Sequence, residues 1–496
     1  MKKALTLLIL VLFVSCSKNS DSELKSNDFD DINDKENSEE TVDLDTCEEL
    51  DLTETEEEDD LSFDDDFDFP DMDEEQIEEE WIPDLSDWSP VKPKKEEKGI
   101  FKIVWLKGTP YEMGFQHGTL LKEELQNGLL NSKYIKDLKW QISLATLAKI
   151  DDMARINSYP DIVEECEGMV AAAGDIGWTI ELCLIANFGD VIVEWIDTIN
   201  PFYATLKKPG CSQFIVSNEA TSDGRTYHGR LLDWDEVDFL LWYPTIFVRQ
   251  PSDGLPHVYI GFPGNLSPYS GMNIAKISGA SNESDPFDIK QQNSSGRSHV
   301  QMLGQALKRF SSLDEINTFI LNEKHMSVEQ FGFADAVNKR GANFEMTAKA
   351  VAKRELKNGA VWLANHFVDP STKDLDKDPT GESSLKRYKR LEQFLTPESE
   401  HSVLGTLNPA TMVNILRDRI DPDTMIESPL GTLDDDKSLA TNGAIYAIIF
   451  DPGNLFFWVA AGKIPVPEEP FVGFSLGELL EISNAKPVKP AVLGEW

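Results

Sequence analysis

The uneven distribution of charge constrains most strongly what this chain can fold into. The chain has 496 residues and a formal net charge of −42. Residues 17–98 contain about 35 acidic and 7 basic residues, so most of the negative excess lies in this one segment. Because the segment has no sustained apolar periodicity, it cannot bury enough apolar surface to offset chain entropy. We therefore predict an acidic, disordered tether over 16–98, kept extended by its like charges, and a single folded unit over 99–496.

A short apolar run precedes the tether. Residues 4–14 follow two lysines and are too short a run to span a bilayer, which is typical of a signal peptide. The run ends at Ser15-Cys16, which resembles the lipobox of bacterial lipoproteins, although Phe13 replaces the usual Leu. The resemblance implies a signal peptide over 1–15, acylation of Cys16 and a membrane anchor. The alternative is an ordinary secretory signal in which Cys16 has no role.

The predicted lipid anchor indicates that the protein is located in a bacterial cell envelope. The outer membrane is favoured, because an anionic tether would be poorly placed against the acidic surface of an inner membrane. The sequence does not predict which membrane face carries the protein, and it does not predict an oligomeric state.

Charge and cysteine content exclude several classes of protein. A basic nucleic-acid-binding face is excluded, since the phosphate backbone would be repelled. Five cysteines are too few for a disulfide framework. We predict no metal and no cofactor, because the seven histidines are scattered and no cysteine pair has ligand spacing. Cys166 and Cys183 lie in apolar helical patterns and are expected to pack as thiols, with a disulfide in an oxidising compartment as the alternative.

The pattern of the folded unit changes at Cys211. Residues 99–210 open with a strand at 101–106 and are then mostly helical, whereas 211–496 alternates strand pairs with helix pairs. This order predicts an α+β layered architecture. Strands are expected at 211–217, 227–234, 244–249, 258–262, 331–337, 344–350, 361–364, 444–450 and 455–460. Helices are expected at 299–310, 313–322, 385–394 and 411–417.

Gly210-Cys211-Ser212 stands at this change of pattern. A cysteine at the head of a strand is ordinarily a packed thiol. However, Arg230 and Asp233 lie on the returning strand of the same predicted hairpin, with Arg230 and Asp233 on opposite faces unless a bulge intervenes. A guanidinium near a thiol favours the nucleophilic thiolate, and an aspartate can hold an ammonium group.

These residues carry a resemblance to a known family. Gly210-Cys211-Ser212, followed by the sequence Gly-Arg-Leu-Leu-Asp-Trp at 229–234, resembles the start of the mature chain in N-terminal-nucleophile (Ntn) cysteine hydrolases. These include peptidase family C45 (penicillin acyltransferase-like), the bile salt hydrolase and penicillin V acylase group, and acid ceramidase. The segment 108–118 is similar to the opening of C45 proenzymes, so the resemblance covers nearly all of 99–496.

The resemblance implies an αββα four-layer sandwich and self-cleavage between Gly210 and Cys211. Cleavage would separate a pro segment, 99–210, from a catalytic segment, 211–496. The freed α-amino group of Cys211 would then act as the base for its own thiol.

The resemblance also implies roles for further residues. Arg230 would lie beside the thiolate, and Asp233 would bind the freed amine. Asn282 would supply an oxyanion-hole side chain, with Asn273 as the alternative in the segment 271–282. Asn365, within the Asn-His-Phe element, would polarise the substrate carbonyl, and Arg387 would support the network. The competing interpretation is that the charged residues form surface ion pairs and the asparagines cap turns.

The predicted function is that of an autoprocessed amidohydrolase or acyltransferase that cleaves a small-molecule N-acyl amide through a thioacyl-enzyme. Aromatic residues near 235–243 and 262–270 suggest an apolar acyl pocket. One alternative is a papain-like cysteine peptidase that uses Cys211 with His366. Another is a surface-binding lipoprotein that has the fold and lacks catalysis.

Overall fold

The computed structural model describes residues 81–132, 144–189, 210–234, 241–284, 289–376, 382–429, 437–463 and 465–494. These residues belong to one compact unit, Ile77–Trp496, which is distinct from Met1–Gln76. The predicted signal peptide, Cys16 and the tether up to residue 80 lie outside the described residues. Among the helices of the described ranges, none combines the length and apolar character needed to cross a membrane.

The folded unit begins earlier than the predicted boundary at residue 99. Strand β1 (Lys94–Lys98) pairs antiparallel with β2 (Phe101–Gly108). The indoles of Trp81 and Trp88 donate hydrogen bonds to backbone carbonyls near the C-terminus, at 2.9 and 2.8 Å. The prediction of a tether up to residue 98 is therefore wrong for residues 81–98. Docked tryptophans and a charged edge strand fix this stretch, although its composition is that of the tether.

Strands of the described ranges form two sheets. The first has the order β1-β2-β5-β6-β7-β8-β9-β10-β11, with β2 and β5 parallel, and the second has the order β12-β3-β4-β13-β14-β15-β16. Besides β1 and β2, the strands of the first sheet are β5 (Thr245–Pro251), β6 (His257–Gly261), β7 (Ser270–Asn273), β8 (Ile277–Glu283), β9 (Glu329–Asp335), β10 (Arg340–Met346) and β11 (Val351–Glu355). Those of the second are β3 (Cys211–Asn218), β4 (Gly224–Asp233), β12 (Ala360–Leu363), β13 (Ala444–Asp451), β14 (Phe456–Ala461), β15 (Phe471–Ser475) and β16 (Val492–Leu493).

Helices cover the outer faces of both sheets. α10 (His299–Arg309) and α11 (Leu313–Asn322) pack on the first sheet, and α12 (Glu382–Leu395) and α13 (Pro409–Leu416) pack on the second. β3 and β4 contact β8 and β9 across the space between the sheets. The predicted αββα sandwich is thus confirmed. The other α-helices of the described residues are α2 (Pro110–Leu120), α3 (Lys122–Asn127), α5 (Leu144–Asn157), α6 (Pro160–Ala173), α7 (Ile180–Ala186) and α14 (Leu476–Leu479).

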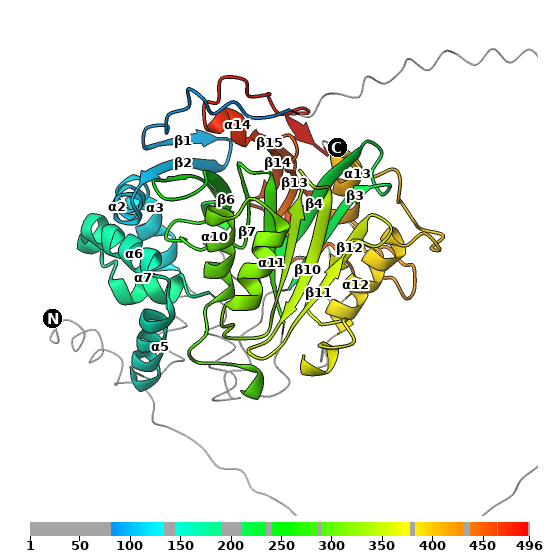
Figure 1. Ribbon diagram of the computed structural model, residues 1–496, viewed down its shortest axis with the longest axis horizontal. Coiled ribbons are helices and arrows are strands. Elements are labelled where there is room, and N and C mark those ends of the chain that lie inside the picture. Colours follow the sequence, from blue (N-terminus) through cyan, green and yellow to red (C-terminus); the bar gives the residue numbers. More distant parts are fainter. Residues whose placement is uncertain are drawn as a thin grey trace, which may run out of the picture. The chain divides into compact units, whose positions relative to one another are not determined.

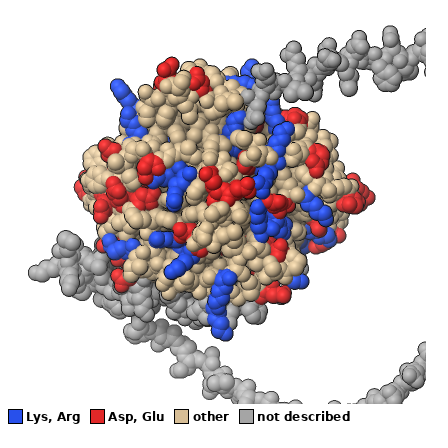
Figure 2. All heavy atoms as spheres, viewed as in Figure 1, with Lys and Arg blue, Asp and Glu red and all other residues tan. Residues whose placement is uncertain are grey.

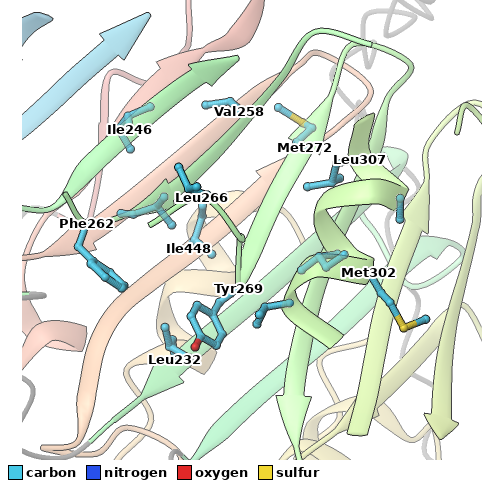
Figure 3. Close-up of a cluster of buried hydrophobic side chains, with 14 of the residues drawn as sticks. Leu232, Ile246, Val258, Phe262, Leu266, Tyr269, Met272, Met302, Leu307 and Ile448 are labelled. Atoms are coloured by element: carbon cyan, nitrogen blue, oxygen red, sulfur yellow. The ribbon is translucent and has the colours of Figure 1, made fainter. Parts of the chain in front are cut away.

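Apolar side chains fill much of the space between the sheets. Leu232 and Ile448 of the second sheet pack in one buried cluster with Ile246, Val258 and Met272 of the first (Figure 3). Because side chains alternate along a strand, the other face of the second sheet forms a separate cluster under α12 and α13. On the face seen in Figure 2, acidic and basic side chains are interspersed, unlike the acidic run of residues 17–80.

The helices of residues 110–186 lie on the side of the first sheet away from α12 and α13 (Figure 1), where α2 contacts β2. The motif at 108–118 has a structural explanation. A Cβ built on Gly114 would lie 1.9 Å from the Glu165 carbonyl oxygen, and one on Gly168 would lie 2.1 Å from that of Tyr111. Glycine is therefore required where α2 and α6 cross.

Two further expectations differ from the structure. Cys166 and Cys183 form a disulfide between α6 and α7, so the prediction of packed thiols is wrong and its alternative holds. Strands β1, β7, β8, β11, β15 and β16 are not among the predicted strands. All of these except β8 are short, and several lie toward sheet edges, where apolar alternation is weak. β8 lies inside the first sheet, and its sequence of mostly small and polar residues has no apolar alternation.

Candidate active site

Cys211 is the first residue of β3 and follows Gly210 directly. Antiparallel pairing places Cys211 opposite Leu232 and Gln213 opposite Arg230 in β4. Alternation then puts the side chains of these residues on the face of the sheet that looks toward the other sheet. Cys211 is 2% exposed, and its thiol is not part of a disulfide.

Arg230 lies beside the Cys211 thiol, as predicted. Its Nη2 donates to Cys211 Sγ at 3.3 Å and also to the carbonyl of Ser281 in β8. The guanidinium is fully buried, so it is not the surface ion-pair residue of the competing interpretation. A buried cation beside a thiol favours the thiolate, because its charge is poorly screened there.

Asp233 lies at the end of β4 beside Gly210. Its backbone N–H donates to the Gly210 carbonyl at 2.7 Å. A Cβ built on Gly210 would lie 3.3 Å from Asp233 Oδ2 and 3.5 Å from Arg387 Nη2. The carboxylate and a guanidinium therefore flank the Gly210–Cys211 peptide bond, and a larger residue at position 210 would crowd both.

Asn365 and Arg387 contact the main chain of Cys211. The Cys211 N–H donates to Asn365 Oδ1 at 2.7 Å. Arg387 of α12 donates through Nη1 to the Cys211 carbonyl and to Ser212 Oγ, and through Nη2 to Asn365 Oδ1 at 2.8 Å. Burial lowers the pKa of Arg387, while the charges of Asp233 and Cys211 oppose this shift.

Asn282, rather than its alternative Asn273, lies at the site. Asn282 Nδ2 donates to the carbonyls of Cys211, at 3.2 Å, and Ala364, at 2.8 Å. Asn273 instead donates to the carbonyls of Leu307 and Phe310 beside α10. In this uncleaved chain the Asn282 amide thus binds the backbone of Cys211, which differs from the predicted contact with a substrate oxyanion.

His366 lies in the loop before α12, and its ring contacts residues of that helix. Its Nδ1 lies 2.7 Å from Ser384 Oγ, and its ring packs on Tyr388. Burial, and then the charges of Arg387 and Arg354, lower the pKa of His366 to about 4. This environment does not favour the peptidase alternative, in which His366 would take the proton from the Cys211 thiol.

Sequence reasoning missed three residues around this site. Tyr446 of β13 accepts from Arg230 Nη1 at 3.1 Å, and its hydroxyl lies 2.8 Å from Ser270 Oγ. Gln213 and His228 are buried on the same faces of β3 and β4 as Cys211 and Arg230. One feature of the sequence indicates Gln213 and His228. Each is a polar residue at an inward-facing position of a predicted strand, two residues from the candidate site residues Cys211 and Arg230.

An apolar pocket adjoins this site. Its lining includes Tyr446 and Leu232, which is opposite Cys211 in the β3–β4 pairing. Trp234, Phe262 and Tyr269 also line it, and Figure 3 shows Phe262, Tyr269 and Leu232 near one another. Of the predicted aromatic residues, Tyr269 lines the pocket, and Phe239 lies outside the described residues. In the part of the chain that the structure describes, no group of three or more His, Cys, Asp or Glu side chains is arranged to hold a metal ion.

One segment of the chain matches the model of a known protein family. Residues 287–463 match the family model "Acyl-coenzyme A:6-aminopenicillanic acid acyl-transferase". Residues 287–463 are therefore similar to the penicillin acyltransferase family over about a third of the chain. The matched segment contains Asn365 and Arg387, whereas Cys211, Arg230 and Asp233 precede it. The predicted resemblance to this family is therefore confirmed.

Similarity to individual proteins is more distant. The chain is 29% identical over 191 residues to an uncharacterized protein of Archaeoglobus fulgidus, covering 35% of this chain and 31% of that protein. It is 29% identical over 160 residues to Protein dcd1B of Dictyostelium discoideum, covering 30% of this chain and 31% of that protein. The chain thus spans about a third of the length of these relatives.

Two solved structures are also similar. One is the Caenorhabditis elegans ortholog of N-acylethanolamine-hydrolyzing acid amidase, with 14% identity, a TM-score of 0.35, and coverage of 49% of this chain and 93% of that chain. The other is a mutant of conjugated bile acid hydrolase from Clostridium perfringens, with 11% identity, a TM-score of 0.35, and coverage of 54% of this chain and 93% of that chain.

Proposed function

We propose that the protein is an Ntn cysteine amidohydrolase or acyltransferase that activates itself by cleaving the Gly210–Cys211 bond. The observation that carries this proposal is the arrangement around Cys211. A buried guanidinium contacts the thiol, a second one contacts the carbonyl, and an amide oxygen accepts from the backbone nitrogen. Surface ion pairs and turn caps would not converge on three different atoms of one cysteine.

The self-cleavage step follows from the neighbours of Gly210. The Cys211 sulfur attacks the Gly210 carbonyl carbon, the C–N bond to Cys211 breaks, and a thioester forms. The departing nitrogen takes up the thiol proton. Water then hydrolyses the thioester, which yields a Gly210 carboxylate and a free thiol. The backbone N–H of Asp233, 2.7 Å from the Gly210 oxygen, supports charge that develops there.

Turnover of substrate would use the new terminus. The freed α-amine lies where Asn365 Oδ1 already accepts from the Cys211 nitrogen, with the Asp233 carboxylate beside it. An α-amine has a pKa of about 7.7–8.0 and can therefore take the thiol proton near neutral pH. The thiolate attacks the carbonyl of an N-acyl amide, the amine leaves, and water or another amine resolves the thioacyl-enzyme.

The pocket supports an apolar acyl group in the substrate. The side chains that line it are aliphatic or aromatic, and their only polar groups are two tyrosine hydroxyls and an indole. An acyl group with a charged end would lose its hydration there without an opposite charge to compensate. We infer that the substrate is a small-molecule amide with an uncharged acyl chain.

The proposal extends to the location of the protein. We infer export, acylation of Cys16 and attachment to the cell envelope by this lipid, with residues 17–80 as an acidic tether. The disulfide between Cys166 and Cys183 supports an oxidising compartment, because such bonds are rare where thiols are kept reduced.

The activity is tested by trapping the acyl group on Cys211. The purified full-length protein is incubated with 7-amino-4-methylcoumarin amides of acetic, phenylacetic and lauric acid, then quenched in acid and analysed by peptide mass. We expect an acyl adduct on Cys211 and release of the coumarin. Both should be greatest with the phenylacetyl and lauroyl amides, whose acyl groups are larger and more apolar. Release at the same rate from Cys211→Ala would contradict the proposal.

A further inference from the structure

A chain of buried hydrogen bonds leads from the sheet interior to the carbonyl of Cys211. His228 Nδ1 lies 3.1 Å from Ser278 Oγ, and His228 Nε2 lies 2.9 Å from Gln213 Oε1. Gln213 Nε2 donates to Asn282 Oδ1 at 2.7 Å, and Asn282 Nδ2 donates to the Cys211 carbonyl. The side chains of Ser278, His228, Gln213 and Asn282 are completely buried.

The direction of this chain is fixed at its end. Asn282 Nδ2 faces two backbone carbonyls, those of Cys211 and Ala364, and only an N–H can satisfy them. Asn282 must therefore turn its oxygen to Gln213, which has to donate. The Gln213 amide nitrogen also faces the carbonyl of Ala280, which agrees with this orientation. Gln213 is left with its oxygen toward His228.

His228 then has one possible tautomer. It must carry its proton on Nε2 to donate to Gln213, and its Nδ1 accepts from the Ser278 hydroxyl. Burial, and then the charge of Arg230, lower the pKa of His228 to about 3, so the ring stays neutral at neutral pH. The chain therefore runs in one direction, from Ser278 through His228 and Gln213 to Asn282.

We propose that Gln213 and His228 are positioning residues that hold the Asn282 amide in the orientation required to bind the Cys211 carbonyl. This inference rests on the proposed function of Cys211. With Asn282 and Arg387 both on that carbonyl, the peptide plane after Cys211 is held in one orientation, and with it the backbone from which the thiol projects. A displacement of about 1 Å at a reacting group can cost about a hundredfold in rate. No water replaces a lost donor in such a buried chain without a cavity to hold it.

The first test measures self-cleavage in the full-length chain. Wild type, Gln213→Met, Asn282→Leu and the double variant are made by cell-free synthesis, and cleavage is followed by gel and mass over time. Gln250→Met is the matched control, because Gln250 is also a buried glutamine with two hydrogen bonds, both to Val91. Thermal melting of each variant shows that it is folded.

We expect Gln213→Met to slow cleavage between tenfold and a hundredfold, while Gln250→Met stays within twofold of wild type. Because Gln213 acts through Asn282, the double variant should be no slower than Asn282→Leu alone, within about twofold. Wild-type cleavage in Gln213→Met would overturn the inference, and so would two independent effects that multiply in the double variant.

The second test does not depend on cleavage. The uncleavable Cys211→Ala chain is labelled with ¹⁵N-histidine, and the His228 signals are identified by their loss in His228→Leu. We expect a neutral ring with the proton on Nε2 between pH 5 and 8. A proton on Nδ1, or titration near pH 6.5, would overturn the hydrogen-bond chain. If wild type does not cleave while the tautomer is as expected, the proposed function fails and the hydrogen-bond chain stands.

Discussion

Two buried arginines approach Cys211 from opposite faces of one sheet, and they contact different atoms. Arg230 lies between the two sheets and contacts the sulfur, the Ser281 carbonyl and Tyr446. Arg387 comes from α12 on the outer face and contacts the Cys211 carbonyl, Ser212 and Asn365. The comparison indicates a division of roles. Arg230 favours the charged form of the thiol, and Arg387 fixes the main chain that carries it.

Each arginine also has a buried histidine as a neighbour. The charge of Arg230 adds to burial in lowering the pKa of His228, and the charge of Arg387 adds to burial in lowering that of His366. Neither histidine is therefore charged at neutral pH. Under the proposed function, proton transfer then falls to the α-amine of Cys211 that self-cleavage would free.

The largest effect is expected from Arg387→Met. Removing a buried guanidinium that donates to four groups should lower the free energy of unfolding by about 3–5 kcal/mol. Loss of its hydrogen bonds to the Cys211 carbonyl and Asn365 should slow self-cleavage by about a thousandfold. Urea unfolding and the cleavage time course measure the two effects. Arg387→Lys is the control that keeps the positive charge and loses the planar guanidinium. Its unfolding free energy and cleavage rate should lie between those of wild type and Arg387→Met. Cleavage of Arg387→Met at the wild-type rate would show that Arg387 has no role in self-cleavage.

The second prediction concerns stability in acid. The pKa of His228 is about 3 in the folded chain and 6.5 when unfolded, so below pH 6.5 the unfolded chain binds a proton that the folded chain does not. This contribution to stability is complete above pH 6.5 and decreases as pH falls toward 3. At pH 4 the loss amounts to about 3 kcal/mol from this one group. His228→Leu should therefore flatten the fall in unfolding free energy between pH 6.5 and 4. An unchanged slope would contradict the assignment of a neutral, buried His228.

The third prediction separates the two arginines by thiol reactivity. Arg230→Met should slow alkylation of Cys211 by iodoacetamide at pH 7 by about tenfold, because an adjacent cation favours the thiolate. Arg387→Lys should alter it by less than about twofold, since the cation that contacts the sulfur remains. Peptide mass spectrometry distinguishes Cys211 from the other cysteines. Equal slowing in both variants would show that the roles are not divided.

The smallest effect is expected from Tyr446→Phe. This change removes one hydroxyl that accepts from Arg230 and leaves the ring in the pocket. A hydrogen bond to a charged group contributes about 1.5–3 kcal/mol. Because Arg230 keeps its bonds to the Cys211 sulfur and the Ser281 carbonyl, only part of this should affect the thiol, and alkylation and cleavage should each slow about threefold to tenfold. An effect as large as that of Arg230→Met would mean that Tyr446, rather than the guanidinium, governs the thiol.

Much of the fold could be predicted from local patterns. The segment that begins at Cys211 predicts a strand over 211–217, and β3 is Cys211–Asn218. The amphipathic segment 313–322 predicts α11 with its observed bounds. By contrast, β1 has a charged sequence that resembles the tether, and only its pairing with β2 makes it a strand.

The sequence predicted several residues of the candidate site, but it did not predict which atoms they contact. Tyr446 is 216 residues from Arg230 in the sequence, and they meet because β13 pairs with β4. The two carbonyls bound by Asn282 are likewise distant in sequence. Local patterns carry no information on such non-local pairing, which is why Gln213, His228 and Tyr446 were missed.

The most direct test is the mass of the purified full-length protein with and without Cys211→Ala. The account predicts two wild-type fragments, the second with Cys211 as its first residue, and an intact Cys211→Ala chain with the same circular dichroism. The parallel pairing of β2 with β5, which joins residues before and after the cleavage point, predicts that the two wild-type fragments elute together. An intact wild-type chain, or cleavage that persists in Cys211→Ala, would contradict the account.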